Sequence, residues 1–256
     1  MAIAAVALTV VGSIPFSVLV AAVALLVSWE WARLVHGADY RTVLAVLVGT
    51  TAVAAVLAAM GYVALGLLVL PIGAILATVL SLGRNSVFSA LGVFYAGFPA
   101  VALIWLRSDP WHGLLATVFV IAIVATSDTA AFFSGRLFRG PLLWERVSPK
   151  KTWSGMLGAL IACAIVGALF WFAIPHGSAL RLGITGAVLS LVAQAGDLAE
   201  SALKRRFGAK DAGDIIPGHG GVMDRVDGII AAASAVGLVA VVVDVYSPAR
   251  ALLFGL

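Results

Sequence analysis

Charged side chains are scarce in this chain. Lys, Arg, Asp and Glu make up only 11% of its 256 residues, whereas 62% of the residues are hydrophobic. A soluble domain usually carries about 25% charged residues, so this composition excludes an ordinary soluble fold. Apolar runs such as FSVLVAAVALLVSW do not alternate between polar and apolar positions, which excludes a membrane β-barrel. We therefore expect an all-α, polytopic helical membrane protein.

Cysteine is nearly absent as well. The single cysteine, Cys163, lies within an apolar run and cannot form an intrachain disulfide. We interpret it as a small core residue. The first apolar run has no basic residue before it and no polar domain after it, so we do not expect a cleavable signal peptide. Insertion as a native membrane protein is the simpler interpretation.

Long apolar runs predict eight membrane-spanning helices, because each span needs roughly 20 apolar residues. A shorter apolar segment near residues 2–12 brings the expected total to about eight or nine helices. Trp29 and Trp31 lie near one span end and indicate an interfacial aromatic belt. Gly61 predicts a tight turn between two antiparallel helices. The predicted spans lie near residues 15–33, 41–58, 61–81, 86–106, 113–133, 155–174, 182–198 and 229–247.

No separate soluble domain, linker or internal repeat is evident. We expect one membrane-embedded domain over residues 1–256, with N-terminal helices in about 1–110 and the catalytic part in about 113–247. The basic residues predict its orientation, because all but Arg107, Arg181 and Arg250 of the 16 Lys and Arg residues would fall on one side of the membrane.

An excess of basic residues marks the cytoplasmic side of a membrane protein. We therefore expect an integral membrane protein whose basic loops lie on the cytoplasmic side of the membrane. Basic loops at a membrane surface suit anionic lipid headgroups and phosphate ligands. We expect the lipid bilayer as a partner and no nucleic acid.

Two polar segments interrupt the apolar sequence before residue 160. In ATSDTAAFFSGR, Asp128 stands within a strongly apolar helix, where an acid usually faces a bundle interior or a wet cavity. A structural pairing with a neighbouring helix is the alternative. In VSPKKTWSG, Lys150 and Lys151 are point charges that suit phosphate oxygens. Lysines beside a span can also serve only as topology determinants.

The third polar segment runs from Gly196 to Gly228 and holds much of the charge in the chain. Asp197 and Glu200 are three residues apart and would share one face of a helix with Ser201 and Lys204. Further along, the adjacent glycines at 220–221 would let the backbone approach a ligand closely. Carboxylates gathered beside Lys and Arg suit Mg²⁺ bound together with phosphate oxygens. The alternative is a self-neutralising ion-pair loop.

Residues 201–227 resemble the signature of phosphatidate cytidylyltransferases, also called CDP-diacylglycerol synthases. SDTAAFFSGRLF, SPKKTWSG and GDLAES are similar to further family segments, and SWEWARL resembles the family's N-terminal WE motif. The likeness covers most of the chain. The signature positions are Ser201, Lys204, Arg205, Lys210, Asp211, Gly213, Pro217, His219, Gly220, Gly221, Asp224, Arg225 and Asp227.

The chain departs from the family pattern at a few positions. Ser154 stands where the family often has Glu, and Arg139 with Gly140 stands where it often has Gly-Lys. The N-terminal hydrophobic region is also short. These departures leave the signature itself complete.

The resemblance implies that CTP and phosphatidate react to give CDP-diacylglycerol and pyrophosphate, with Mg²⁺ as cofactor and room for a second metal ion. It also suggests a homodimer. On this hypothesis Asp197 and Asp224 hold the metal, and Asp128 and Asp227 support the site either as further ligands or by contacting the ligand residues. The residues assigned to catalysis are Asp197, Asp224, Asp227 and Lys204.

The same hypothesis assigns substrate binding to the basic and small polar residues of the VSPKKTWSG segment and of the signature. Asp224→Ala is expected to abolish turnover while the protein still inserts. The residues assigned to substrate binding are Ser148, Lys150, Lys151, Thr152, Ser201, Arg205, Lys210, His219, Gly220, Gly221 and Arg225.

Other functions were weighed against this one. A transporter would carry charges through mid-span positions and show broken helices in matching halves, and neither is seen. A catalytically silent scaffold would have lost some of the metal or phosphate residues, and none is lost. A CDP-alcohol phosphotransferase would space its aspartates differently. A sibling cytidylyltransferase acting on a polyprenyl or ether-lipid phosphate stays open, because acyl recognition would lie in apolar helices.

Overall fold

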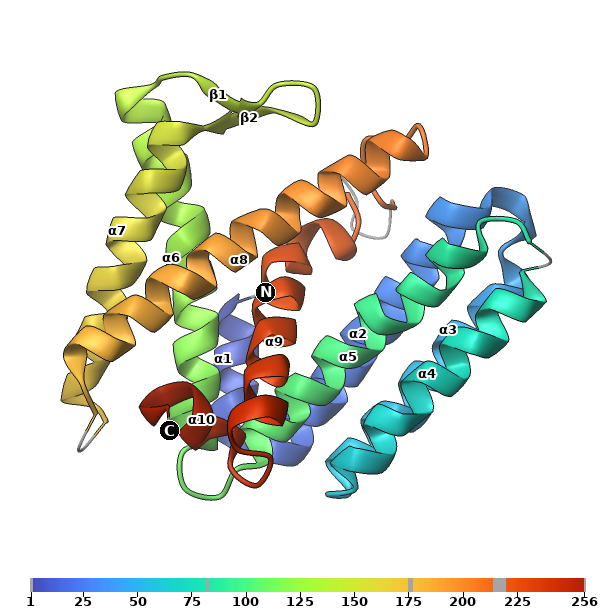
Figure 1. Cartoon of the computed structure of the whole chain (residues 1–256), viewed down its shortest axis with the longest axis horizontal. Coiled ribbons are helices and arrows are strands. Elements are labelled where there is room, and N and C mark those ends of the chain that lie inside the picture. The colour runs from blue at the N-terminus through green and yellow to red at the C-terminus, as the bar shows by residue number, and fades with distance from the viewer. Residues whose placement is uncertain (1, 82, 175–176, 214–219, 256) are drawn as a thin grey trace. The chain divides into compact units, whose positions relative to one another are not determined.

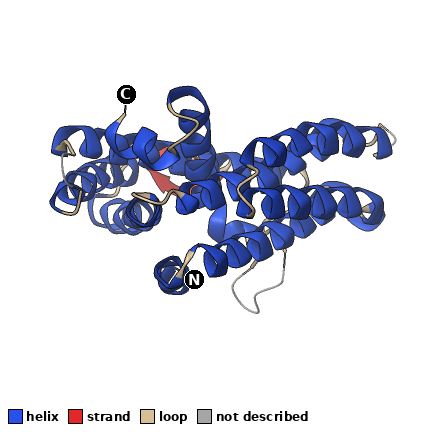
Figure 2. Cartoon of the chain, turned by 90° about the horizontal axis from the view of Figure 1, so that it is seen from below, coloured by secondary structure: helices blue, strands red, loops and turns tan. Residues whose placement is uncertain are grey.

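The computed structural model describes residues 2–81, 83–174, 177–213 and 220–255. Nearly all of these residues are helical, and one small strand pair is present (Figure 2). Within the described residues, eight helices are long and apolar enough to cross a membrane. The prediction of an all-α polytopic membrane protein is therefore confirmed. The first helix, α1 (Ala2–Val11), has ten residues and is too short to be one of the eight.

The chain divides into two compact units. Unit 1 comprises residues 1–6, 109–203 and 227–256, and unit 2 comprises residues 7–108 and 204–226. The signature segment therefore groups with the helices of the first hundred residues. The expectation of a single domain with a C-terminal catalytic part stays a prediction.

Unit 2 contains four helices that pack side by side (Figure 1). Gly61 lies in the short turn between the second and third of them with φ of +89°, as its position in the sequence predicted. Gly66 packs against the backbone of the preceding helix, where a Cβ would lie 2.8 Å from the carbonyl oxygen of Ala54. The helices are α2 (Ser13–His36), α3 (Arg41–Ala59), α4 (Val63–Leu80) and α5 (Ser86–Ser108), and the short 3-10 turn η1 (Gly37–Asp39) follows α2.

In unit 1, α6 (Gly113–Phe138) packs against α7 (Trp153–Leu169). Between them, β1 (Leu142–Trp144) and β2 (Ser148–Thr152) form an antiparallel hairpin in which Leu142 pairs with Thr152. Gly167 lets α7 approach the next helix closely, since a Cβ there would lie 2.4 Å from the carbonyl oxygen of Leu182. The remaining elements are η2 (Phe170–Phe172), α8 (Ala179–Arg206), α9 (Met223–Val243) and α10 (Pro248–Phe254).

Two helices extend further than their apolar stretches predicted. The predicted span 182–198 is part of α8, which continues to Arg206. The predicted span 229–247 overlaps α9, which begins earlier, at Met223, and ends at Val243, four residues before the predicted end. With 28 residues, α8 is about 42 Å long, whereas the hydrocarbon core of a bilayer is about 30 Å thick. The polar residues from Asp197 onward therefore lie on a helix that is long enough to carry them out of the hydrocarbon.

Candidate active site

The first polar cluster lies in unit 1 and contains three aspartates from three different helices. Asp128 comes from α6, Asp197 from α8 and Asp227 from α9. Their carboxylates are close enough for the charges to repel one another. We call these three residues the acid cluster. Sequence analysis selected all three as candidate metal ligands, and the fold brings them together.

A lysine from the hairpin joins the acid cluster. The Nζ atom of Lys151, in β2, lies 2.5 Å from Oδ2 of Asp197, and Lys151 also attracts the charge of Asp128. Oδ1 of Asp197 receives a long hydrogen bond of 3.5 Å from the Ser201 hydroxyl, one helical turn further along α8. The hairpin strand that carries Lys151 thus contacts the GDLAES segment of α8 in the structure.

Glu200 adds a fourth carboxyl group beside the acid cluster. Its side chain is only 2% exposed and lies close enough to Asp227 to interact with it electrostatically. Two carboxyl groups in such contact need a shared proton or a nearby cation, because like charges repel. Lys151 compensates only part of this negative charge, so the cluster has the electrostatic character of a cation site.

Carboxylate oxygens are the ligands that Mg²⁺ prefers, and the donor set of the acid cluster fits that ion in kind. Within the described ranges, no three acidic, His or Cys side chains already converge as a formed metal-binding group. Lys151 contacts one carboxylate oxygen of Asp197. Asp128, Asp197 and Asp227 are the residues that would hold the ion.

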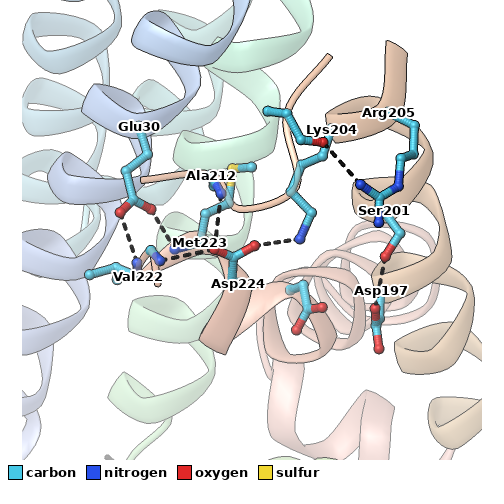
Figure 3. A network of polar contacts seen from close by, with 12 residues as sticks. Glu30, Asp197, Ser201, Lys204, Arg205, Ala212, Val222, Met223 and Asp224 are labelled. Carbon is cyan, nitrogen blue, oxygen red and sulfur yellow. Dashed lines mark hydrogen bonds and ion pairs between the residues drawn. The ribbon is translucent and has the colours of Figure 1, made fainter. Parts of the chain in front are cut away.

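The second polar cluster lies in unit 2 and is organised around Glu30 and Asp224 (Figure 3). Glu30 is completely buried on α2, and its two carboxylate oxygens accept hydrogen bonds from consecutive backbone N–H groups. Val222 N–H donates to Oε1 at 2.8 Å and Met223 N–H donates to Oε2 at 2.6 Å. These N–H groups belong to the beginning of α9. We call this pairing the Glu30 anchor.

Asp224 is bonded through both of its oxygens. Oδ2 accepts hydrogen bonds from the backbone N–H groups of Ala212, at 3.0 Å, and Gly221, at 2.9 Å. Oδ1 contacts the ammonium group of Lys204 in a largely buried ion pair (Figure 3). We call residues 207–222, which link α8 to α9, the signature loop. Through these bonds Asp224 connects Ala212 and Gly221 of the signature loop with Lys204 in the last turn of α8.

These bonds occupy the N-terminus of α9. The first N–H groups of a helix have no intrahelical partner, which makes a helix N-terminus a potential anion site. Here the N–H groups of Gly221, Val222 and Met223 are already bonded to Asp224 and Glu30. These three N–H groups are therefore not available to a further anion in this arrangement.

Several predicted substrate-binding residues are exposed. Arg205, Lys210 and Arg225 lie at the surface of unit 2, and Lys150 lies at the surface of the hairpin in unit 1. Arg205 donates a long hydrogen bond of 3.4 Å to the carbonyl of Ala209. The positive charge and exposure of these side chains suit them to contact with phosphate oxygens.

The remaining predicted residues have local structural roles or lie outside the described part. Thr152 is the N-cap of α7 and accepts a hydrogen bond of 3.1 Å from the N–H of Gly155. Ser148 pairs with Trp144 in the hairpin. Gly220 lies beside Asp224 with φ of +84°, a backbone conformation that favours glycine. His219 lies outside the described residues.

Sequence reasoning assigned no role to Glu30 or Glu200. Glu200 was placed correctly on the face of Asp197 but was not selected as a site residue. Glu30 carries a clear signal, because a carboxylate within an apolar membrane-length helix is costly and needs a partner. Its neighbours Trp29 and Trp31 drew the interpretation toward an interfacial belt instead.

The two departures from the family pattern contact each other. The Ser154 hydroxyl donates a hydrogen bond to the backbone carbonyl of Arg139. A Cβ at Gly140 would lie 3.7 Å from the Ser154 hydroxyl, so both departures are part of the joint between α6, the hairpin and α7.

Comparisons with known proteins identify the family of the chain. The sequence profile described as the cytidylyltransferase family matches residues 1–243. The chain belongs to the cytidylyltransferase family. A phosphatidate cytidylyltransferase of Brucella suis biovar 1 (strain 1330) is 40% identical over 232 residues, which cover 89% of this chain and 84% of the relative.

Two more distant members of the cytidylyltransferase family match a shorter part of the chain. Phosphatidate cytidylyltransferase of Haemophilus influenzae is 39% identical over 150 residues, covering 57% of this chain and 52% of the relative. That of Staphylococcus saprophyticus is 39% identical over 155 residues, covering 59% and 58%. The resemblance that the signature indicated is therefore confirmed.

Proposed function

We propose that this protein transfers the cytidylyl group of CTP to phosphatidate, forming CDP-diacylglycerol and releasing pyrophosphate. The observation that carries the proposal is the acid cluster with Lys151, gathered on helices that are long enough to cross a membrane. The family relationship supports nucleotidyl transfer, and the named activity of the relatives supports phosphatidate as the acceptor.

In the proposed reaction, an oxygen of the phosphatidate phosphate forms a bond to the α-phosphorus of CTP. The bond from that phosphorus to the oxygen bridging to the β-phosphorus breaks, and pyrophosphate leaves with the electron pair. A phosphate oxygen is already deprotonated near neutral pH, so no general base is required. The main barriers are the repulsion between two anions and the need to align them.

The residues of the chain would meet these needs in two ways. Asp128, Asp197 and Asp227 would hold Mg²⁺, which when bound neutralises phosphate charge. Lys151, which pairs with Asp197, would bind a phosphate oxygen of the substrate. The prediction that Asp224 also ligates the metal stays a prediction.

The signature segment would contribute cations for the phosphates. Lys204 is held by Asp224, whereas Arg205, Lys210 and Arg225 are exposed. We propose that the exposed cations bind the triphosphate of CTP and that the active site faces the cytoplasm of a bacterial cell from its inner membrane. A homodimer, suggested by the resemblance, is part of the proposal and is checked by the mass of the protein–detergent particle in light scattering.

The test uses purified protein in detergent micelles with phosphatidate, Mg²⁺ and CTP labelled at the α-phosphate. We expect label to move into the lipid phase and the transfer to require both phosphatidate and Mg²⁺, so that EDTA stops it. Asp39→Asn is a matched control, because Asp39 forms an exposed ion pair with Arg84 away from both clusters. Absence of transfer in folded protein, repeated with a polyprenyl phosphate and an ether-lipid phosphate, would overturn the proposal or redirect it to another acceptor.

A further inference from the structure

We propose that Glu30 is a positioning residue for the transfer reaction, fixing the beginning of α9 and with it Asp224 and Lys204. This inference rests on the proposed function. Glu30 is 0% exposed, and its oxygens accept the N–H groups of Val222 and Met223 at 2.8 and 2.6 Å. A residue of α2 thus determines the backbone position of a segment about 190 residues later in the chain.

The signature loop is shaped to fit the Glu30 carboxylate. A Cβ at Gly213 would lie 2.8 Å from Oε1 of Glu30, and a Cβ at Gly221 would lie 2.8 and 2.9 Å from its two oxygens. Side chains rarely approach so closely, so both glycines are required for space and not for an unusual backbone angle. Both ends of the loop therefore pack directly on one buried carboxylate.

Glu30 is coupled to Asp224 through the backbone. Three consecutive N–H groups are divided between the two carboxylates, with Gly221 donating to Asp224 and the next two donating to Glu30. A shift of the backbone at Val222 would move the N–H group of Gly221 and weaken its hydrogen bond to Asp224. Because Asp224 holds Lys204, the effect would reach a cation of the signature.

An apolar residue at position 30 would not preserve this arrangement. It would leave two buried N–H groups without acceptors, which is more costly than the loss of an exposed hydrogen bond. Glutamine keeps the shape but supplies one acceptor oxygen, and its NH₂ group would face the second N–H. Glu30→Gln therefore weakens the anchor while it preserves packing.

The experiment compares wild type, Glu30→Gln, Gly213→Ala and Ser28→Ala in detergent micelles. Gly213→Ala presses on Glu30 from the loop side and leaves the carboxylate in place. Ser28→Ala is the matched control, because Ser28 is also buried on α2 but bonds to Ala24 and Thr51. Amide hydrogen exchange of residues 220–226 without substrate measures the anchor directly. The kcat and KM for CTP, taken well below each thermal midpoint, measure its effect on transfer.

We expect Glu30→Gln and Gly213→Ala to speed exchange at 220–226 and to lower kcat/KM by about 10-fold to 100-fold, as expected for weakened bonds to a charged group. Ser28→Ala should change neither. If kcat/KM of folded Glu30→Gln stays within about twofold of wild type, the positioning role is overturned. If Glu30→Gln does not fold, Gly213→Ala decides by the same measure. If wild type itself transfers no label, the proposed function fails, while exchange still reports whether Glu30 anchors the loop.

Discussion

Glu30 and Asp197 are both carboxylates on membrane-length helices, yet their oxygens meet different surroundings. Both oxygens of Glu30 accept short hydrogen bonds from backbone N–H groups that cannot move without moving the chain. Asp197 contacts the side chain of one lysine and, at 3.5 Å, that of one serine, and it is repelled by Asp128 and Asp227. Both oxygens of Glu30 therefore have hydrogen-bond donors fixed in the backbone, whereas the negative charge of Asp197 is compensated only in part.

This difference separates a structural acid from a candidate catalytic one. A carboxylate whose oxygens are both bonded to the fold stabilises that fold and has little left for a ligand. A carboxylate near others of the same charge destabilises the unliganded protein and gains most from a bound cation. The comparison therefore favours the acid cluster as the metal site of the proposed function and Glu30 as a residue that organises the backbone around Asp224.

The largest expected effect on transfer comes from Asp197→Asn. The substitution removes charge from the acid cluster, so cytidylyl transfer should fall by roughly 10²-fold to 10³-fold. Stability should stay the same or rise, because repulsion with Asp128 and Asp227 is relieved. Label transfer and thermal unfolding in micelles check the two parts. A large loss of stability would contradict the distinction between the clusters, and Asp39→Asn should leave both measurements unchanged.

Asp224→Ala should affect activity and stability together. It removes the acceptor of two backbone N–H groups and leaves Lys204, whose side chain is 13% exposed, without its carboxylate partner. Breaking a largely buried ion pair from one side costs about 3–5 kcal/mol in the free energy of unfolding. Turnover should be lost as well, while the protein still inserts into the membrane.

A double variant sharpens this prediction. Asp224→Ala combined with Lys204→Met should recover part of the lost stability, because the buried cation is removed too, but none of the activity. Unfolding of the two single variants and the double variant completes the cycle. If Asp224→Ala unfolds at the wild-type temperature, Asp224 does not organise the loop and belongs with the metal ligands instead.

Much of the fold followed from local patterns in the sequence. Eight apolar runs of sufficient length predicted eight spans, and Gly61 predicted the turn between α3 and α4. Asp128 stood out because it interrupts an apolar helix, whereas Asp197 and Asp227 were selected from the charged segment that contains the family signature. Such patterns depend only on neighbouring residues, so a sequence reading recovers them.

Which carboxylates are bonded to donors of the fold and which face like charges could not be predicted from the sequence. Asp224 and Asp227 lie three residues apart in the same signature, but one accepts three donors and the other faces like charges. Glu30 reaches its partners only after α2 and the start of α9 have packed together. Contacts between residues so far apart in the chain leave no local periodic signal, so they become visible only in the folded structure.

Thr152→Ala tests a smaller effect. Sequence analysis placed Thr152 among the substrate-binding residues, whereas the structure gives it the N-cap of α7. Loss of an N-cap should lower the free energy of unfolding by about 1 kcal/mol, and Thr152→Ser should restore it. Transfer should change little in either variant. A tenfold rise in KM for CTP at unchanged stability would instead support the sequence-based assignment.

The smallest effect is expected where a donor-matched carboxylate lies outside both clusters. Asp244, just after α9, accepts hydrogen bonds from the N–H groups of Tyr246 and Ser247 and from the Arg250 guanidinium, which is the main cause that holds the pKa of Asp244 below its ordinary value. A depressed pKa stabilises the folded state above the ordinary aspartate pKa, at about pH 4, and that contribution is lost as pH falls through the lower folded pKa. Arg250→Gln should therefore lower the thermal midpoint slightly at pH 5–7 and progressively less below about pH 4, with transfer unchanged. Thermal unfolding measured across this pH range checks the sign, and a deficit that grows toward acid would show that Asp244 does not belong with Glu30 among the donor-matched carboxylates.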